Sequence, residues 1–418
     1  MALHLPPSLR HRDFRNYFLG SIVTTAGSQF TTVVLYWQMW EITGSALWLA
    51  ALGLSRAIAQ IGLALVGGLL ADSLDRRRFM VAMQLLQAVA SLALFALALG
   101  GLISPWALML GNLVFAVGSA LETPARQAVV ANLVPRTDFA SAVALNNVGR
   151  NASPAVGSSL AGALFAAAGP SWCYLVDGLS WFAMIAVLLS LRSTLQSERR
   201  SNVTFAALAD GIRFVRGQRV ILSFMVLDFG ATFFGTATSL LPIYASDILH
   251  VGPVGFGLLN AAPSVGQVIT GVIMGSTNRI RRAGKWVLLG VGFYGACICG
   301  FALSSWFPLS LLLLAGTGVG NGVSAVLRST SNNLLTPDDL RGRVAAVNSV
   351  FTGGGPQLGQ FEGGLVAEAF GAMASALSGG VGVLVLVALI ALVPEVRRFD
   401  LTAAIHALNE PVAPPGRR

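Results

Sequence analysis

The chain has 418 residues, of which 55% are hydrophobic and only 11% charged, with a net charge of +9 and a mean hydropathy of +0.72. So few charges cannot cover the surface of a water-soluble protein of this length, which excludes the ordinary soluble classes. The three cysteines lie in apolar segments and the four histidines are scattered, so the sequence predicts neither a disulfide framework nor a metal site.

Apolar segments follow one another along the whole chain, and a bilayer core needs roughly 20 apolar residues per helix. We predict twelve transmembrane helices and therefore an all-α membrane protein. Their approximate bounds are 14–41, 46–72, 78–100, 105–126, 139–168, 171–192, 218–247, 254–277, 285–304, 307–331, 343–369 and 373–394. The first segment is longer than a signal-peptide core and has no cleavage-like end, so we expect the protein to retain it.

Among the connections between these helices, positive charge occurs only in alternate ones. None of the 27 Lys and Arg residues falls in the connections near 43, 102, 169, 251, 306 and 371. The positive-inside rule places the other side, with both termini, in the cytoplasm. The anionic inner leaflet then accounts for the basic net charge without a nucleic-acid partner.

One stretch of the chain occurs twice. Residues 118–169 align with residues 320–371 at a constant offset of 202 and without a gap. Gly and Pro are prominent among the identical positions because they mark turns and close helix contacts. We therefore predict a duplicated module with two pseudo-symmetric six-helix halves at 1–192 and 218–396. A cytoplasmic linker at 193–217 contains an interfacial helix near 204–216, and a cytoplasmic tail occupies 397–418. Identical pairs include Gly118/Gly320, Arg126/Arg328, Asn146/Asn348, Pro154/Pro356, Gly157/Gly359 and Gly162/Gly364.

Several motifs resemble those of a known family. The segment 67–78, GGLLADSLDRRR, resembles the loop between helices 2 and 3 of the major facilitator superfamily. The segments 133–146, 335–344 and 394–400 are similar to its drug-efflux branch, which contains macrolide efflux pumps and the enterobactin exporter. The resemblance implies the major facilitator fold and a location in the bacterial inner membrane.

The loop after helix 2 is predicted to act as a gate. Gly68 permits close helix approach, and Asp72 faces the positive end of another helix. The resemblance implies that this loop locks the halves on the cytoplasmic side, with Arg76 pairing with an acid and Glu122 completing the relay near the inner end of helix 4. Ser73 and Asp75 depart from the family pattern.

Helices 5 and 11 each contain a helix-bend motif, with Pro154 and Gly157 in one and Pro356 and Gly359 in the other. A proline inside a membrane helix frees a carbonyl and bends the axis, while nearby small residues allow close packing. The resemblance associates such an element in helix 5 with antiporters. Ordinary small-residue packing is the alternative.

Charged residues inside the membrane are the sharpest functional signal. Arg56 and Arg150 lie roughly 15 Å along their helices, and facing lipid there would cost at least ~2.5 kcal/mol. We therefore expect each to face the interior or an acid. Asp228 lies at a comparable depth and Glu362 in the outer third, where either could bind the coupling proton or pair with these arginines. Acids predicted nearer the outer surface are Glu41, Asp177, Asp247 and Glu368.

The predicted cavity is lined by aromatic and polar residues, which suit amphipathic organic molecules. Those we single out are Gln29, Tyr36, Phe233 and Asn260. We predict a monomeric secondary transporter that exports a bulky, drug-like amphipathic compound by alternating access, as a proton antiporter. The alternatives are export of an enterobactin-like siderophore, with Arg56 and Arg150 binding the ligand, and a non-transporting membrane sensor or scaffold. We expect no cofactor, and no enzyme activity because no nucleophile or metal constellation is present.

Overall fold

The computed structural model describes residues 6–73, 75–193, 195, 205–235, 237–275, 282–337 and 340–402, with side chains at all of them except 64–73, 205–208, 237 and 350. This part of the chain is built from helices and contains no strand. The all-α class is therefore confirmed.

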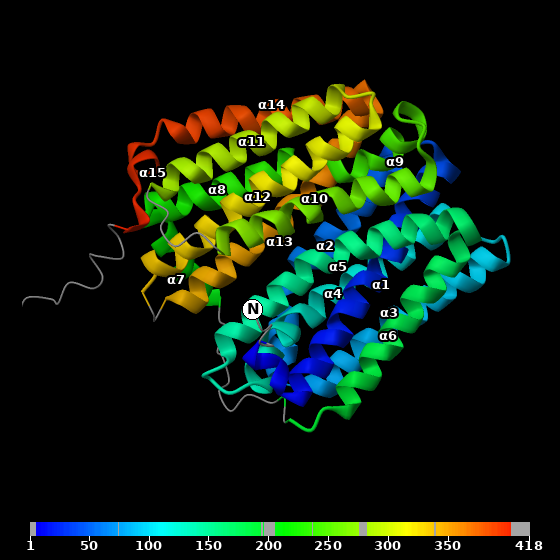
Figure 1. Ribbon diagram of the computed structural model, residues 1–418, viewed down its shortest axis with the longest axis horizontal. Helices are drawn as coiled ribbons and strands as arrows, with labels where there is room; N and C mark the ends of the chain where they lie inside the picture. The colour runs from blue at the N-terminus through cyan, green and yellow to red at the C-terminus, as the bar shows by residue number, and fades with distance from the viewer. Residues whose placement is uncertain are drawn as a thin grey trace, which may run out of the picture.

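Six long helices form the N-terminal half, drawn in blue to green in the lower part of Figure 1. Ser104 caps the fourth by accepting a hydrogen bond from the backbone N–H of Ala107 at 3.2 Å, which satisfies one of the free donors of a helix start. The helices are α1 (Arg12–Thr43), α2 (Ala46–Ser73), α3 (Arg76–Leu99), α4 (Pro105–Leu133), α5 (Phe139–Ala168) and α6 (Pro170–Ser190).

The C-terminal half forms the upper part of Figure 1 and follows the short helix α7 (Phe205–Gly217). Arg343 donates to Asp210 of α7 at 3.1 Å, which ties α7 to this half. The remaining elements are α8 (Arg219–Phe234), η2 (Ala237–Leu240), α9 (Leu241–Ile243), η3 (Tyr244–Ile248), α10 (Gly252–Gly275), α11 (Ala283–Leu303), α12 (Phe307–Leu335), α13 (Arg341–Phe370), α14 (Ala372–Ala391) and α15 (Pro394–Arg398).

Two predicted helix boundaries are wrong, and one predicted helix is interrupted. Helix α4 continues to Leu133 instead of ending near 126, and α12 continues to Leu335 instead of 331. Hydropathy falls at these positions because polar residues face a cavity, although the helices continue. The segment expected as one helix at 218–247 changes to 3₁₀, α and π geometry after Phe234. Pro242 has no N–H to donate there, which disfavours a regular α-helix.

Within the described residues, ten helices are long and apolar enough to cross a membrane, where the sequence predicts twelve. The two predicted spans outside this set are α5 and α13, which have 30 residues each and contain the bend prolines of the repeat. Both helices carry polar side chains, and several of these side chains line the cavities. Their lower apolarity thus reflects an inward-facing surface.

The repeated glycines lie at repeated helix contacts. A Cβ on Gly157 of α5 would lie 2.3 Å from the Ala26 carbonyl of α1, and one on Gly359 of α13 would lie 2.1 Å from the Phe233 carbonyl of α8. Each bend motif therefore packs against the first long helix of its own half. Small-residue packing, the alternative reading of these motifs, is present in both halves.

The next repeated glycine packs across to the other half. A Cβ on Gly162 of α5 would lie 2.7 Å from the Pro253 carbonyl of α10. A Cβ on Gly364 of α13 would lie 2.6 Å from the Cβ of Ala50 in α2. The identity of these glycines across the repeat thus follows from two equivalent contacts between the halves.

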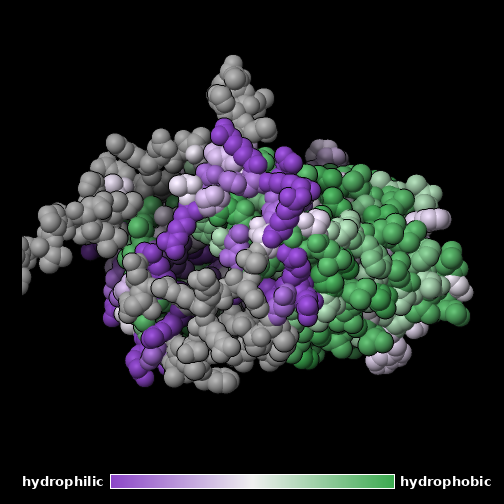
Figure 2. Space-filling view, turned by 90° about the horizontal axis from the view of Figure 1, so that it is seen from below, coloured by the Kyte–Doolittle hydropathy of each residue, from purple (hydrophilic) through white to green (hydrophobic). Residues whose placement is uncertain are grey.

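These contacts lie toward one end of the bundle, which we call the arginine-free end because it carries the connections near 43, 102, 169, 251, 306 and 371. Described hydrogen bonds between the halves also gather in this part. Tyr36 donates to Gln360 Oε1 at 2.7 Å, and Trp40 Nε1 donates to Ser246 at 3.0 Å. Figure 2 shows hydrophilic residues gathered in one part of the molecule and mainly hydrophobic residues toward its other end.

Glu368 of α13 joins the halves by capping a helix of the other half. Its Oε2 accepts hydrogen bonds from the Ser45 hydroxyl and the Leu47 backbone N–H, both at 3.0 Å. A carboxylate at the start of α2 interacts favourably with the free N–H groups and the positive end of the helix dipole. This cap therefore stabilises the contact at the arginine-free end.

Candidate functional site

Two cavities lie among the polar faces of these helices. The N-half cavity has a volume of about 440 Å³ and the C-half cavity about 570 Å³. Gln357 of α13 also lines the N-half cavity, so both halves bound it. Charged residues lining the N-half cavity are Arg56, Glu122, Arg126, Arg150 and Asp177. Those lining the C-half cavity are Asp228, Arg328 and Arg341.

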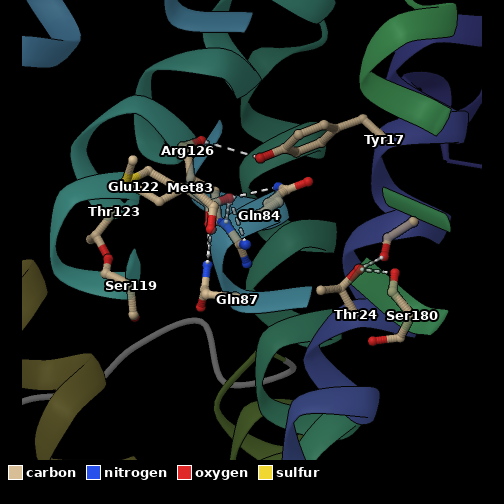
Figure 3. Close-up of polar contacts among 11 residues, drawn as sticks. Tyr17, Thr24, Met83, Gln84, Gln87, Ser119, Glu122, Thr123, Arg126 and Ser180 are labelled. Atoms are coloured by element: carbon tan, nitrogen blue, oxygen red, sulfur yellow. Dashed lines mark hydrogen bonds and ion pairs between the residues drawn. The ribbon is translucent and has the colours of Figure 1, made fainter. Parts of the chain in front are cut away.

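Glu122 lies on α4 in the wall of the N-half cavity, and only 2% of it is exposed. Its Oε1 accepts hydrogen bonds from Gln84 Nε2 at 2.7 Å and Arg126 Nη2 at 2.8 Å, and its Oε2 accepts one from Gln87 Nε2 at 3.4 Å (Figure 3). Tyr17 donates to the backbone carbonyl of Arg126 at 3.4 Å. The buried carboxylate of this ion pair is thus supported by amide donors, as a carboxylate removed from water requires.

The equivalent arginine of the C-half, Arg328 on α12, pairs with an acid from a different helix. Its Nη2 forms an ion pair with Asp228 of α8, and its Nη1 donates to Ser324 at 2.7 Å. Ser324 stands at the repeat position of Glu122. The two halves therefore keep the same arginine and take its acid from different places. Identity across the repeat was the signal in the sequence that could have identified both arginines as site residues.

Arg56 of α2 faces the N-half cavity and is held by neutral groups. Its Nε donates to Asn112 Oδ1 at 2.8 Å, and its guanidinium lies 5.8 Å from the centre of the Tyr36 ring. Asn112 is positioned in turn by donating to the Leu52 carbonyl at 3.0 Å. Among the described residues no ion pair joins Arg56 to an acid.

Arg150 of α5 is exposed and lines the same cavity. It forms no ion pair within the described part of the chain. Arg56 and Arg150 both line the N-half cavity, and their roles as substrate or coupling residues stay predictions. Asp228 does not pair with either of them, because Arg328 is its partner. Glu362 is partly buried on α13, and no ion pair to it is described.

The predicted cytoplasmic lock is only partly described. Gly68 and Asp72 belong to α2, but their contacts lie outside what the structure describes. Arg76 is buried and donates to the Leu195 carbonyl at 3.4 Å. Glu122 was expected near the inner end of its helix, but α4 continues about three turns beyond it. Glu122 lies in the cavity wall, farther from the inner end of its helix than predicted, and its role in the relay stays a prediction.

The remaining predicted lining residues divide into two groups. Gln29 lines the N-half cavity, where the Ser158 hydroxyl donates to its Oε1 at 3.4 Å. Tyr36 is buried between the halves, Phe233 stacks on Phe229 with ring centres 5.8 Å apart, and Asn260 donates to a carbonyl of its own helix. None of these three lines either cavity. The expected aromatic wall is therefore wrong for the described cavities, whose linings are rich in hydroxyl and amide groups.

Asp177 of α6 was expected near the outer surface, but it is 1% exposed and borders the N-half cavity. The position of Asp177 along its predicted helix did not reveal this burial, because the packing of α1, α3 and α6 decides which side chains are enclosed. Its Oδ1 is buried without a hydrogen-bond partner. No group of three or more His, Cys, Asp or Glu residues that could hold a metal ion occurs in the part of the chain searched, which is its described part.

Comparisons with known proteins agree with this architecture. A family model described as transmembrane secretion effector matches residues 4–414. The enterobactin exporter EntS of Shigella boydii serotype 4 (strain Sb227) is 26% identical over 398 residues, which cover 94% of each chain. The multidrug efflux pump Tap of Mycolicibacterium fortuitum is 26% identical over 400 residues, covering 92% of this chain and 96% of Tap.

Solved structures of transporters share the fold. The nucleoside transporter NupG superimposes with a TM-score of 0.68 at 13% identity, covering 91% of this chain and 99% of NupG. A bacterial homolog of the human lysosomal transporter Spinster, in an inward-facing and unoccupied conformation, gives 0.65 at 13% identity over 99% of this chain and 100% of that chain. The resemblance drawn from the motifs is thus confirmed, and the family consists of transporters and not of enzymes. The chain belongs to the transmembrane secretion effector family of the major facilitator superfamily.

Proposed function

We propose that the protein is a secondary active transporter that exports a bulky amphipathic organic compound by alternating access in exchange for protons. The observation that carries the proposal is the pair of charged cavities within two halves that share a repeated module. Exporters among the relatives, EntS and Tap, support the direction of transport. In this proposal α5 and α13 also cross the membrane, which gives twelve spans in two six-helix halves with a cytoplasmic linker at 193–217 and tail at 397–418.

The arginine-rich connections and both termini are proposed to face the cytoplasm of a bacterium. Described contacts between the halves concentrate at the opposite, arginine-free end. The C-half cavity extends to Thr336 and Arg341, which lie at the arginine-rich end of α12 and α13. These observations support a cytoplasm-facing conformation, in which a substrate enters from the cytoplasm. In this proposal the protein acts as a monomer.

Siderophore export is a second candidate, favoured by the charges of the N-half cavity. Arg56 and Arg150 line it without an ion pair to an acid among the described residues. A guanidinium without a carboxylate partner favours an anionic or catecholate group of a ligand. Hydroxyl and amide groups around them suit a ligand with many oxygen atoms. A cationic drug would meet an unfavourable field in this cavity.

Transport in proteoliposomes tests the proposal and separates the two substrates. Purified full-length protein is reconstituted with its cytoplasmic face outward, and the lumen is made acidic. The probes are ethidium, an amphipathic cation, and enterobactin, a catecholate. We expect one of them to accumulate in the lumen and a protonophore to abolish that accumulation.

Each outcome has a defined meaning. Accumulation of enterobactin alone establishes the siderophore candidate, and accumulation of ethidium establishes drug export. If folded protein moves neither probe with or without the gradient, organic export is overturned and the sensor or scaffold alternative is favoured.

A further inference from the structure

Asp177 lies where three helices of the N-terminal half come into close contact. It belongs to α6, which packs against α1 and α3, and only 1% of it is exposed. A Cβ on Gly27 of α1 would lie 2.2 Å from the Ser180 hydroxyl of α6, so these helices approach closely. The carboxyl nevertheless borders the N-half cavity. It is therefore enclosed by protein and adjacent to a compartment of the transport pathway.

Around Asp177 there are more short oxygen–oxygen contacts than there are hydroxyl protons to form them. Its Oδ2 lies 2.7 Å from Thr31 Oγ1 and 2.9 Å from Ser91 Oγ, and Ser91 Oγ also lies 2.9 Å from the Tyr174 carbonyl. A carbonyl only accepts, and each hydroxyl has one proton to donate. With an ionised carboxyl, one of the contacts made by Ser91 would join two oxygens with no proton between them. A proton on Asp177 Oδ2, donated to Ser91, satisfies these three contacts and leaves only the longer contact of 3.3 Å between Thr31 Oγ1 and Ser91 Oγ without a proton.

The charges around Asp177 also favour a neutral carboxyl. No basic side chain forms an ion pair with it among the described residues. The groups that face it are hydroxyls, Thr31 from α1 and Ser91 from α3, while α6 itself adds the neutral titratable groups of Tyr174 and Cys173. An ionised carboxylate without a cation in such a place costs several kcal/mol. Charged groups elsewhere on the cavity wall are Arg56 of α2, Glu122 and Arg126 of α4, and Arg150 of α5.

The other buried acids of the two cavities have arginine partners. Glu122 pairs with Arg126 and Asp228 pairs with Arg328. An adjacent guanidinium stabilises the ionised form of a carboxylate and opposes its protonation. Asp177 differs from both because its partners are neutral hydroxyls. Among these three carboxyls it is the one whose surroundings accept a proton without leaving an arginine unpaired.

A donor for the ionised form lies one turn away. Trp181 of α6 lines the same cavity, and its Nε1 is buried without a hydrogen-bond partner, as is Asp177 Oδ1. Residues four apart on a helix are neighbours on its surface. A small rearrangement that brings the indole N–H to Oδ1 would stabilise the carboxylate after its proton leaves.

We propose that Asp177 is the proton-binding group of the transport cycle, and this inference rests on the proposed proton-coupled export. When the cavity faces outward, a proton from external water forms an O–H bond at Oδ2, and that O–H donates to Ser91. When the cavity faces the cytoplasm, the same O–H bond breaks and the proton passes to water of the N-half cavity. One proton and one positive charge are carried inward per protonation event. No other covalent bond changes.

Infrared difference spectroscopy of the full-length protein tests the protonation directly. Spectra in acid and alkaline buffer report the C=O stretch of a protonated carboxyl that titrates between them. We expect Asp177→Asn to remove this band and Asp228→Asn to leave it, because Asp228 forms an ion pair with Arg328 and Asp177 has no such partner among the described residues. We expect Ser91→Ala to keep the band but shift its frequency, since the carboxyl loses the hydroxyl to which it donates. A band that survives unshifted in Asp177→Asn and Ser91→Ala overturns the inference.

Transport separates failure of this inference from failure of the proposed function. The probe is whichever of ethidium and enterobactin the parent protein accumulates. We expect Asp177→Asn to lose accumulation driven by the pH gradient at least tenfold while retaining exchange of labelled for unlabelled probe without a gradient. Equal gradient-driven accumulation by variant and parent overturns the role of Asp177 and leaves proton-coupled export intact. If the parent moves neither probe, the proposed function fails, and the role in transport proposed for Asp177 fails with it even where the infrared band identifies a protonated carboxyl.

Discussion

Arginines that line the two cavities are of two kinds, and their partners distinguish them. Arg126 and Arg328 each hold a buried carboxylate. Arg56 is bound by an amide oxygen and an aromatic ring. The first kind is neutralised within the protein and contributes to structure. The second keeps charge that remains available to a ligand.

Loss of Asp228 should destabilise the C-terminal half. Asp228→Asn leaves Arg328 buried beside a neutral amide, and removal of one partner of a buried ion pair costs about 3–5 kcal/mol. We expect a clear decrease in the melting temperature of detergent-purified protein, measured by intrinsic fluorescence. Glu362→Gln is the matched control, because Glu362 is a partly buried acid that forms no ion pair among the described residues. The double variant Asp228→Asn/Arg328→Gln should lose less than the two single losses added together, and full additivity would contradict coupling of the pair.

Loss of Arg56 should weaken binding of an anionic ligand while preserving the fold. A hydrogen bond from a charged donor contributes about 1.5–3 kcal/mol, which corresponds to roughly a 10–150-fold increase in Kd for enterobactin in Arg56→Gln. Tryptophan fluorescence titration measures this change. Ethidium binding should change by less than threefold or become tighter. Equal weakening for both probes would indicate a structural role for Arg56.

At the scale of the helices, four glycines set the distances between α5, α13 and their neighbours. Gly157 and Gly359 allow packing inside each half, while Gly162 and Gly364 allow packing between halves. A repeated helix therefore contacts its own half near its middle and the opposite half nearer the arginine-free end. Each bend motif therefore has a neighbour within its own half, and the segment nearer the arginine-free end has a neighbour in the other half. In the proposed transport cycle, this second contact separates when the cavity opens outward.

A methyl group at the inter-half glycines should weaken closure at the arginine-free end. Gly162→Ala and Gly364→Ala place a Cβ within 2.7 Å of the opposite half, and overpacking of this kind costs about 1–3 kcal/mol. Spin labels that replace Leu102 and Trp306, which are 70% and 65% exposed in the two halves, report the separation by double electron–electron resonance. We expect a larger population at long distances in both variants.

The control for this experiment is Gly271→Ala in α10, where an added Cβ meets nothing within 4 Å. Its distance distribution should match that of the parent protein. Unchanged distributions in Gly162→Ala and Gly364→Ala would show that this contact does not hold the halves together.

The helices and the repeat could be predicted from the sequence because length, apolarity and the spacing of Gly and Pro are local properties. The ends of α4 and α12 could not be located because hydropathy falls where a helix presents polar residues such as Arg126 to a cavity. The interruption after Phe234 also escaped prediction, since a proline such as Pro242 is tolerated in many membrane helices.

Less of the candidate site than of the fold could be predicted from the sequence. Arg56 and Arg150 were found because charge within an apolar segment is rare. The pairing of Asp228 with Arg328 could not be found, because it depends on how α8 crosses α12. The same holds for Asp177, whose burial results from the packing of α1 and α3 around α6.

For the whole molecule, the distribution of arginines predicts its orientation. Leu102 lies in an arginine-free connection and Arg136 in an arginine-rich one, and both are exposed. In right-side-out membrane vesicles, a membrane-impermeant maleimide should label Leu102→Cys directly and Arg136→Cys only after permeabilisation. Native Cys173, Cys297 and Cys299 are replaced by alanine in this background. Labelling in the reverse order would invert the proposed topology.

The different origin of the acids beside Arg126 and Arg328 has a mechanical consequence. Glu122 and Arg126 are on one helix, so their pair moves with α4 as a single body in any state of the cycle. Asp228 and Arg328 join α8 to α12, so sliding of these two helices past each other would separate buried charges. Among the described residues, the C-terminal half therefore has a buried ion pair between two helices, and the buried ion-pair acid of the N-terminal half is paired within one helix. We expect the N-terminal half to be the more deformable partner, and the one whose internal helix packing changes more as the protein alternates between its states.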